Sequence, residues 1–240
     1  MSSLLAGIQD VLFPARCLAC DALLGRHRLP LLCSDCASRL VPLISPLCLC
    51  CGIPFAAGED HLCGNCLAGK SPFDLIRSAF SYQEPLVSLI HQLKFGRRLT
   101  GLATLGVLAR NSSACSSLSR PDLILPVPLH VRRLRQRGFN QSLLLARSCF
   151  PDWKDRIAAT GLGRIRDTIP QTELSGKERR KNLKGAFCLN VPGGVAGKSV
   201  LLVDDVLTTG STVVECSRVL QKAGAARVEV FTPALALKSA

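Results

Sequence analysis

The sequence predicts an α/β fold in which a parallel sheet flanked by helices follows a small Cys-rich region. From residue 73 onward, short apolar runs alternate with helical patterns, and this order of elements is typical of a parallel sheet. Before that point, four pairs of cysteines recur with the same internal spacing. We therefore expect a Cys-rich domain over residues 1–70 and a sheet domain over residues 71–240.

The composition favours a folded protein with polyanionic partners. Hydrophobic residues make up 48% of the chain, and 30 Lys and Arg against 17 Asp and Glu give a formal net charge of +13. Such an excess favours a polyphosphate substrate or nucleic acid. No secretory signal is expected, because Met1–Ser3 lacks a basic start and Asp10 interrupts the apolar stretch. The uncharged run 40–58 contains three prolines, so we expect a cytoplasmic protein without membrane insertion.

The cysteine pairs predict two structural zinc ions. Two residues separate the cysteines of each pair, and a tight turn of that length presents both thiolates to one ion. Sequential assignment gives one ion the four thiolates of Cys17, Cys20, Cys33 and Cys36, and gives the other ion those of Cys48, Cys51, Cys63 and Cys66. The spacing is also compatible with a cross-braced arrangement of first pair with third. An S4 zinc site has no open coordination position, so we expect a structural role.

Three further residues of the Cys-rich region could bind metal, but we expect none of them to do so. Cys50 lies inside the third pair and is a ninth, spare cysteine, whereas His27 and His61 are more typical of surface residues. Metal binding, worth ~10–16 kcal/mol in small zinc modules, would supply the stability that the few periodic apolar residues here do not.

Next in order come a strand over 73–82, a helix opened by Pro85, a second helix over 99–110 and a Ser-rich loop over 111–119. A strand over 122–128 then precedes an arginine-rich segment. The arginines could line a solvated helix face, but Gly138–Asn140 ends the segment in a turn, so we favour a loop that binds pyrophosphate. Asn140 then begins an amphipathic helix.

The segment 164–187 is polar and basic, with few apolar residues. Its length and polarity favour a mobile lid over an anionic ligand, in which Arg164 and Arg166 bind, although a merely exposed loop would have the same composition.

The run VLLVDDVLTTGST at 200–212 indicates a buried strand, a tight turn and the start of a helix over 211–223, before a last strand over 226–232. Gly210 lets the backbone approach a phosphate, and helix N–H groups would point at it. The carboxylates of Asp204 and Asp205 suit the two hydroxyls of a ribose but would repel a second phosphate. The pattern therefore favours a ribose 5-phosphate over a dinucleotide or a triphosphate.

Five segments together resemble the ComF family, which includes the ComFC and GntX proteins. They are the four cysteine pairs, FDLIRSAFSYQEPLVSLIHQLKFG, RLRQRGFNQS, RIRDTIPQTELSGKERRKNLKGAF and VLLVDDVLTTGST, and Cys50 is the one departure. The resemblance implies a type I phosphoribosyltransferase fold behind a double zinc ribbon. It also implies phosphoribosyl pyrophosphate (PRPP) with magnesium as ligand, and a link to DNA uptake, natural transformation and single-stranded DNA.

By that resemblance, Asp204 and Asp205 are the catalytic candidates that hold the ribose hydroxyls, and the loop 128–140 faces pyrophosphate. The expected PRPP-binding residues are Val203, Asp204, Asp205, Thr208, Thr209, Gly210, Ser211, Thr212, Arg137, Arg164 and Arg166. The residues identify no acceptor and no base. Three hypotheses therefore stay open: a phosphoribosyltransferase with an unidentified acceptor, a DNA-processing factor that binds single strands and other uptake proteins, and a PRPP-sensing regulator without DNA contact.

Overall fold

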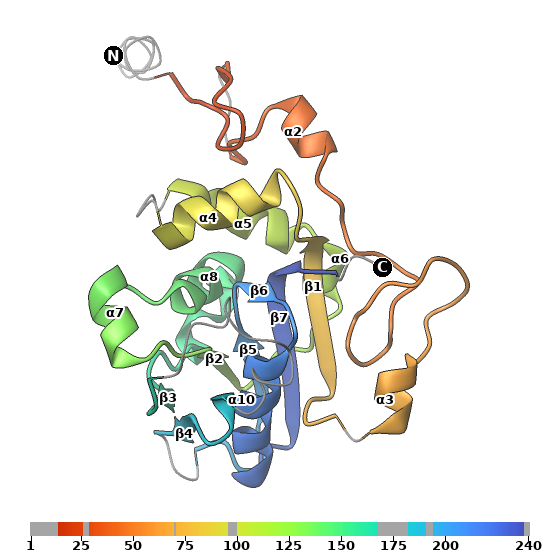
Figure 1. Cartoon of the computed structure of the whole chain (residues 1–240), viewed down its shortest axis with the longest axis vertical. Helices are drawn as coiled ribbons and strands as arrows, with labels where there is room; N and C mark the ends of the chain where they lie inside the picture. Colours follow the sequence, from red (N-terminus) through yellow and green to blue (C-terminus); the bar gives the residue numbers. More distant parts are fainter. Residues whose placement is uncertain are drawn as a thin grey trace.

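The computed structural model describes residues 14–25, 29–69, 71–95, 100–167, 182–190 and 194–237. At its centre lies a parallel sheet in the order β1-β7-β5-β2, with β6 paired to β7 (Figure 1). These strands are β1 (Leu75–Ser81), β2 (Leu123–Pro126), β5 (Ser199–Val203), β6 (Val206–Leu207) and β7 (Arg227–Leu235). The predicted α/β class with a parallel sheet is confirmed.

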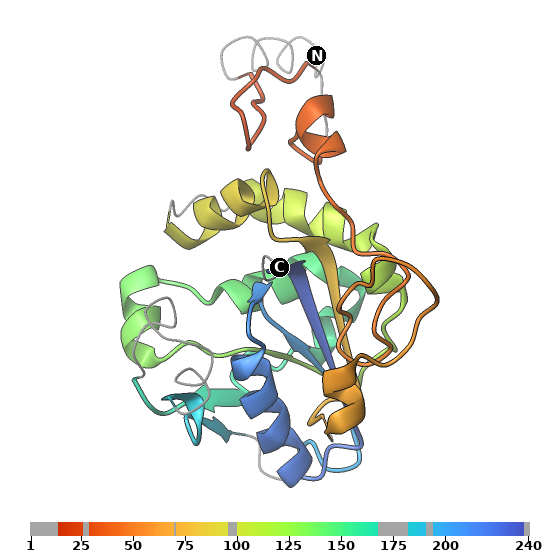
Figure 2. The same ribbon diagram turned by 45° about the vertical axis from the view of Figure 1, so that its right-hand side comes forward.

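Both faces of the sheet are covered, which is why its strands are almost continuously apolar. On one face, Leu201, Val203 and Phe231 pack into a core with the helices α4 (Leu86–Phe95), α5 (Thr100–Arg110) and α8 (Gln141–Cys149). On the other face, Val200 and Leu202 join a second core with α10 (Ser211–Lys222), visible in front of the sheet in Figure 2. Alternate residues of β5 therefore contribute to opposite cores.

The Cys-rich region covers the outer edge of β1. It contains the short helices α2 (Ser34–Ser38) and α3 (Gly64–Ala68). The segment that connects these two helices bonds to β1: the Leu43 N–H donates to the carbonyl of Ala79 at 3.0 Å, and the Ser81 N–H donates to the carbonyl of Val41 at 2.8 Å. Because an open strand edge is a site for unwanted pairing, this cover protects the sheet. Figures 1 and 2 both show the orange segment running beside β1.

Smaller elements complete the fold and correct one expectation. The stretch expected as a Ser-rich loop contains the one-turn helix α6 (Ser113–Ser116), because the Ser112 side chain accepts from the Cys115 N–H and caps it. The remaining elements are α7 (Val131–Arg137), the 3-10 helix η1 (Pro151–Arg156) and the antiparallel strands β3 (Leu162–Arg164) and β4 (Phe187–Leu189). Within the described ranges, no helix combines the length and the hydropathy that crossing a bilayer requires.

Candidate functional site

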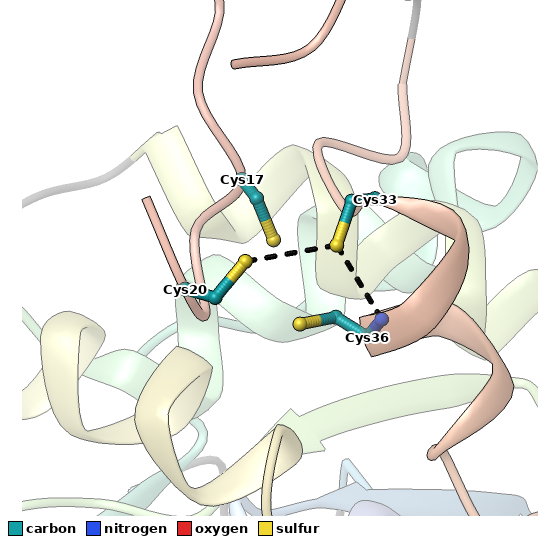
Figure 3. A group of neighbouring side chains, drawn as sticks. All are labelled: Cys17, Cys20, Cys33 and Cys36. Atoms are coloured by element: carbon teal, nitrogen blue, oxygen red, sulfur yellow. Dashed lines mark hydrogen bonds between the residues drawn. The ribbon is translucent and has the colours of Figure 1, made fainter. Parts of the chain in front are cut away.

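The cysteines form two groups of four whose geometry fits zinc. In each group, all four Sγ atoms lie within 4.8 Å of one another. The Sγ atoms of Cys20 and Cys33 are 3.6 Å apart in the first group (Figure 3), and those of Cys51 and Cys63 are 3.7 Å apart in the second. A tetrahedral S4 site with Zn–S bonds of ~2.3 Å requires S···S separations of about 3.8 Å. The groups are sequential, which decides between the two pairings that the spacing allowed.

One thiol in each group is held ready to ionise. Burial by itself would raise the pKa of Cys17, but hydrogen bonds from the backbone N–H groups of Cys33, Cys20 and Ala19 outweigh it and lower this pKa to about 6. Cys48 follows the same pattern: burial opposes ionisation, and backbone N–H groups led by that of Cys63 lower its pKa to about 6. Burial raises the pKa of Cys36 and of Cys51 to about 12, so each group holds one thiol that ionises readily beside others that would ionise only on binding a cation.

Neither the Cys50 thiol nor the His61 ring belongs to either group of four. The Cys50 thiol faces the carbonyl of Phe73 at 3.9 Å. The His61 ring stacks on Phe55 with ring centroids 3.8 Å apart, and its Nδ1 lies 2.8 Å from the carbonyl oxygen of Glu59. His27 lies outside the described residues.

The acid pair lies at the carboxyl end of β5, where parallel sheets place their ligands. The Asp204 N–H donates to the carbonyl of Phe231 at 3.1 Å and so makes the last backbone bond between β5 and β7 before the chain bends. Its carboxylate oxygen Oδ1 accepts from the Ser142 hydroxyl at 3.1 Å and from the Asp205 N–H at 2.9 Å. Asp204 is therefore oriented by both the sheet and α8.

The loop after the acids differs in one respect from the tight turn that we predicted. The chain first makes β6, whose residues Val206 and Leu207 pair with Ala234 and Leu235 of β7. The turn follows over residues 208–210 and ends at Gly210, which precedes α10 with a φ of 70°. Here the Thr209 and Ser211 hydroxyls are 2.9 Å apart. The long β7 explains the difference, because its last residues offer pairing partners beyond the acids.

The arginine-rich segment is a helix, so our preference for a loop was wrong. His130 is the N-cap of α7, and Gly138, at a φ of 83°, closes it by donating from its N–H to the carbonyl of Leu134 at 2.8 Å. None of the residues of α7, all of which the structure describes, is buried. Gly138 does produce a turn, but it is the turn of a helix end that favours glycine. The arginines therefore lie along a solvated helix.

Two of the predicted arginines lie in the electrostatic field of the acids. Arg137 is half-buried at the end of α7, and this partial burial lowers its pKa, whereas the Asp205 carboxylate opposes the shift. Burial likewise lowers the pKa of Arg164, whose guanidinium carbon lies 5.6 Å from the centroid of the Phe187 ring and whose charge interacts with Asp204. Arg166 is exposed and donates to the carbonyl of Lys184 at 2.8 Å. The charges of Arg137 and Arg164 thus interact with the acids, whereas Arg166 has a different partner.

The segment expected as a lid is described only at its ends, since residues 168–181 lie outside the described ranges. The C-terminal end is packed, whereas residues 165–167 at the N-terminal end are exposed. Arg164 pairs with Phe187 across β3 and β4, and Leu183 and Ala186 are fully buried in the second core. The lid therefore stays a prediction for the part of the segment that lies outside the described ranges.

Sequence reasoning missed the residues that hold Asp204. Asn140 caps α8: its Oδ1 accepts from the Ser142 N–H at 3.0 Å, and its Nδ2 donates to the carbonyl of Val127 at 3.1 Å. The Ser142 hydroxyl is then directed at Asp204. The sequence Asn-Gln-Ser before an apolar helix predicts the cap itself. It does not predict the acceptor of the Ser142 hydroxyl, because Asp204 is 62 residues away along the chain.

Comparison with known proteins finds two family models that match parts of the chain. A family model described as a double zinc ribbon domain matches residues 8–67, and one described as a phosphoribosyl transferase domain matches residues 159–239. A solved structure of glutamine PRPP amidotransferase from B. subtilis, complexed with ADP and GMP, aligns with 60% of this chain and 30% of that chain at 21% identity and a TM-score of 0.38.

Three relatives extend over most of the chain. DNA utilization protein YhgH of Escherichia coli (strain K12) is 41% identical over 207 residues, covering 83% of this chain and 88% of the relative. Competence protein F of Haemophilus influenzae is 36% identical over 227 residues, 91% of this chain and 96% of the relative. Competence protein ComFC of Bacillus subtilis is 29% identical over 213 residues, which cover 83% of this chain and 82% of the relative. The chain belongs to this ComF family of competence and DNA utilization proteins, with a double zinc ribbon and a phosphoribosyltransferase domain.

Proposed function

We propose that this protein binds PRPP together with Mg²⁺ at the acid pair and the loop that follows it. The observation that carries the proposal is the order of groups at the end of β5: two adjacent carboxylates, a hydroxyl-rich turn, and Gly210 in the left-handed region at the start of α10. Helix N–H groups and the helix dipole favour a phosphate at such a turn. Carboxylates that flank it favour the hydroxyls of an attached ribose.

Each group then has a role in binding. Residues 208–212 take the 5-phosphate, Val203 ends the strand that supports them, and Asp204 and Asp205 take the ribose hydroxyls. Arg137 and Arg164 supply positive charge to the pyrophosphate, and Arg166 remains a sequence-based candidate for the same role. Magnesium would be held mainly by oxygens of the substrate and water, as is usual for this ion.

If an acceptor exists, the reaction is displacement of pyrophosphate at the anomeric carbon of the ribose. The protein would contribute by positioning the two reactants and by stabilising the charge of the leaving group. A PRPP-sensing regulator would use the same site without this step.

Calorimetric titration of the zinc-loaded protein with PRPP and Mg²⁺ tests the site. We expect binding by the wild type and none by Asp204→Asn combined with Asp205→Asn, because the ribose would lose both carboxylates. Asp152→Asn is the matched control, since Asp152 is an exposed acid on η1. Unchanged affinity in the double variant would contradict the proposal.

We further propose that the protein acts in the cytoplasm on DNA during uptake, with single-stranded DNA and other uptake proteins as partners. Relatives are named for DNA utilization and competence, and the net charge is +13. On α7, Arg132 and Arg135 are exposed beside the exposed apolar residues Val131 and Leu134. Charge with apolar contact suits single strands. We also propose that the chain divides into a Cys-rich domain over residues 1–70 and a sheet domain over residues 71–240.

Fluorescence anisotropy with a labelled oligonucleotide tests this second function. Replacing Arg132 and Arg135 with serine should weaken binding and reduce the slope of log K against log salt by about 0.7 for each phosphate that the protein no longer neutralises. Arg120, an exposed arginine before β2, is the control position. PRPP binding without any salt-dependent DNA binding would favour the regulator instead.

A further inference from the structure

Arg77 is a buried cation in the middle of β1, directly beside the second cysteine group. Its side chain is 9% exposed. The Nη1 donates to the carbonyls of Ile76 at 2.9 Å and Cys48 at 3.3 Å, and the Nη2 donates to the carbonyl of Leu49 at 3.4 Å. Since burying a charge is costly unless it is well paired, this cluster of acceptors must be maintained for Arg77 to stay in place. Two of these acceptors belong to the metal-binding turn.

The same turn is fixed to β1 through its backbone. The Ile76 N–H donates to the carbonyl of Cys50 at 2.7 Å. Gly52 has a φ of 68°, and a Cβ at this position would lie 2.6 Å from the carbonyl oxygen of Ile76. The turn of residues 48–52 therefore approaches the strand more closely than any residue other than glycine would allow.

From Arg77, one row of paired residues crosses the sheet to the acid pair. Arg77 is in register with Phe231 of β7, and Phe231 is in register with Val203 of β5. The carbonyl of Phe231 accepts the hydrogen bond from the Asp204 N–H at 3.1 Å. The first cysteine group is attached elsewhere, because the carbonyl of Leu18 accepts from the Gln92 side chain on α4.

We propose that Arg77 is a positioning residue that couples metal occupancy of the second cysteine group to the order of the acid pair. With metal bound, Cys48 and Cys51 fix the turn, and the turn presents its carbonyls to Arg77. Without metal, Arg77 loses these fixed acceptors, β1 loses its register with the turn, and the row that ends at the Asp204 N–H loosens. Linkage makes the effect reciprocal: whatever orders Asp204 also retains the second metal. The proposal does not depend on which ligand the acids bind.

Hydrogen exchange of the Asp204 amide in the zinc-loaded protein tests the coupling. Cys66→Ser removes a ligand from the second group, and Cys20→Ser is the matched change in the first. We expect Asp204 exchange to rise about tenfold in Cys66→Ser, a size typical of coupled sites, and to keep the wild-type rate in Cys20→Ser. The Ala158 amide, which donates to the carbonyl of Ile124 at 3.0 Å, reports global unfolding and should stay unchanged in both.

Release of zinc to a chromophoric chelator tests Arg77 itself. In Arg77→Met, one of the two ions should leave about tenfold faster, and Asp204 exchange should rise with it. Arg39→Met is the control, because the Arg39 Nη2 donates to the Cys36 Sγ of the first group at 3.4 Å, away from this row. Arg77→Lys, which keeps the charge but loses the planar fork, is used if Arg77→Met does not fold. Wild-type zinc release in the Arg77 variant, or equal Asp204 exchange in the Cys66 and Cys20 variants, would overturn the proposal.

Discussion

Replacing Ser142 with alanine isolates the contact that orients Asp204. Ser142 is 5% exposed, and its hydroxyl donates to the Asp204 Oδ1 at 3.1 Å. The change removes one oxygen atom and keeps the hydrogen bond from the Asp205 N–H to Oδ1. A hydrogen bond to a charged group contributes about 1.5–3 kcal/mol. If PRPP binding requires the carboxylate to be restored to this orientation, its affinity should fall about 10- to 150-fold.

Calorimetry with PRPP and Mg²⁺ measures this loss of affinity, and two further variants serve as controls. Ser142→Thr keeps the hydroxyl and should retain most of the affinity. Ser148→Ala removes a hydrogen bond of the same kind on the same helix, because the Ser148 hydroxyl donates to the carbonyl of Leu102 at 2.9 Å, but it should leave PRPP affinity unchanged. Wild-type affinity in Ser142→Ala, or an equal loss in Ser148→Ala, would refute the reasoning.

Four further predictions concern stability. In α5, Gly106→Ala should lower the free energy of urea unfolding by about 1–3 kcal/mol, because its Cβ would lie 2.7 Å from a backbone oxygen of α8. Gly101→Ala in the same helix has 3.8 Å to its nearest neighbour and should raise it by up to about 1 kcal/mol. Gly210→Ala should cost about 1–2 kcal/mol at a φ of 70°, measured in the same way. Hydrogen bonds from the Ser199 N–H and hydroxyl lower the pKa of Asp122. Their stabilisation is present above the unfolded pKa of ~3.9 and is lost as pH falls through the lower folded value, so the Tm difference between wild type and Asp122→Asn should shrink below about pH 4.

The sequence alone was sufficient wherever the deciding interactions are local. Cysteine spacing predicts the four tight turns, because each pair closes its own turn, and the apolar run 200–203 predicts β5, whereas the fold decides which pairs share a site. The sequence was insufficient where an element far away along the chain determines the local structure. The residues of β6 pair only because β7 continues to Leu235, and Gly138 ends a helix as readily as it ends a loop. The contact between Ser142 and Asp204 depends on how α8 crosses the sheet, which no local pattern encodes.

The two carboxylates of the acid pair are held in different ways. Asp204 is the residue at which the chain leaves the ladder with β7: its N–H is still bonded to Phe231, while its carboxylate is tied to α8. Asp205 is one residue beyond the ladder and lies in the field of Arg137 from α7. Successive residues of an extended chain point in opposite directions, so the bend after β5 is what would allow both carboxylates to reach the single ribose that we propose as ligand. The first acid therefore has an orientation set by the sheet, and the second can respond to the charge of the helix that faces it.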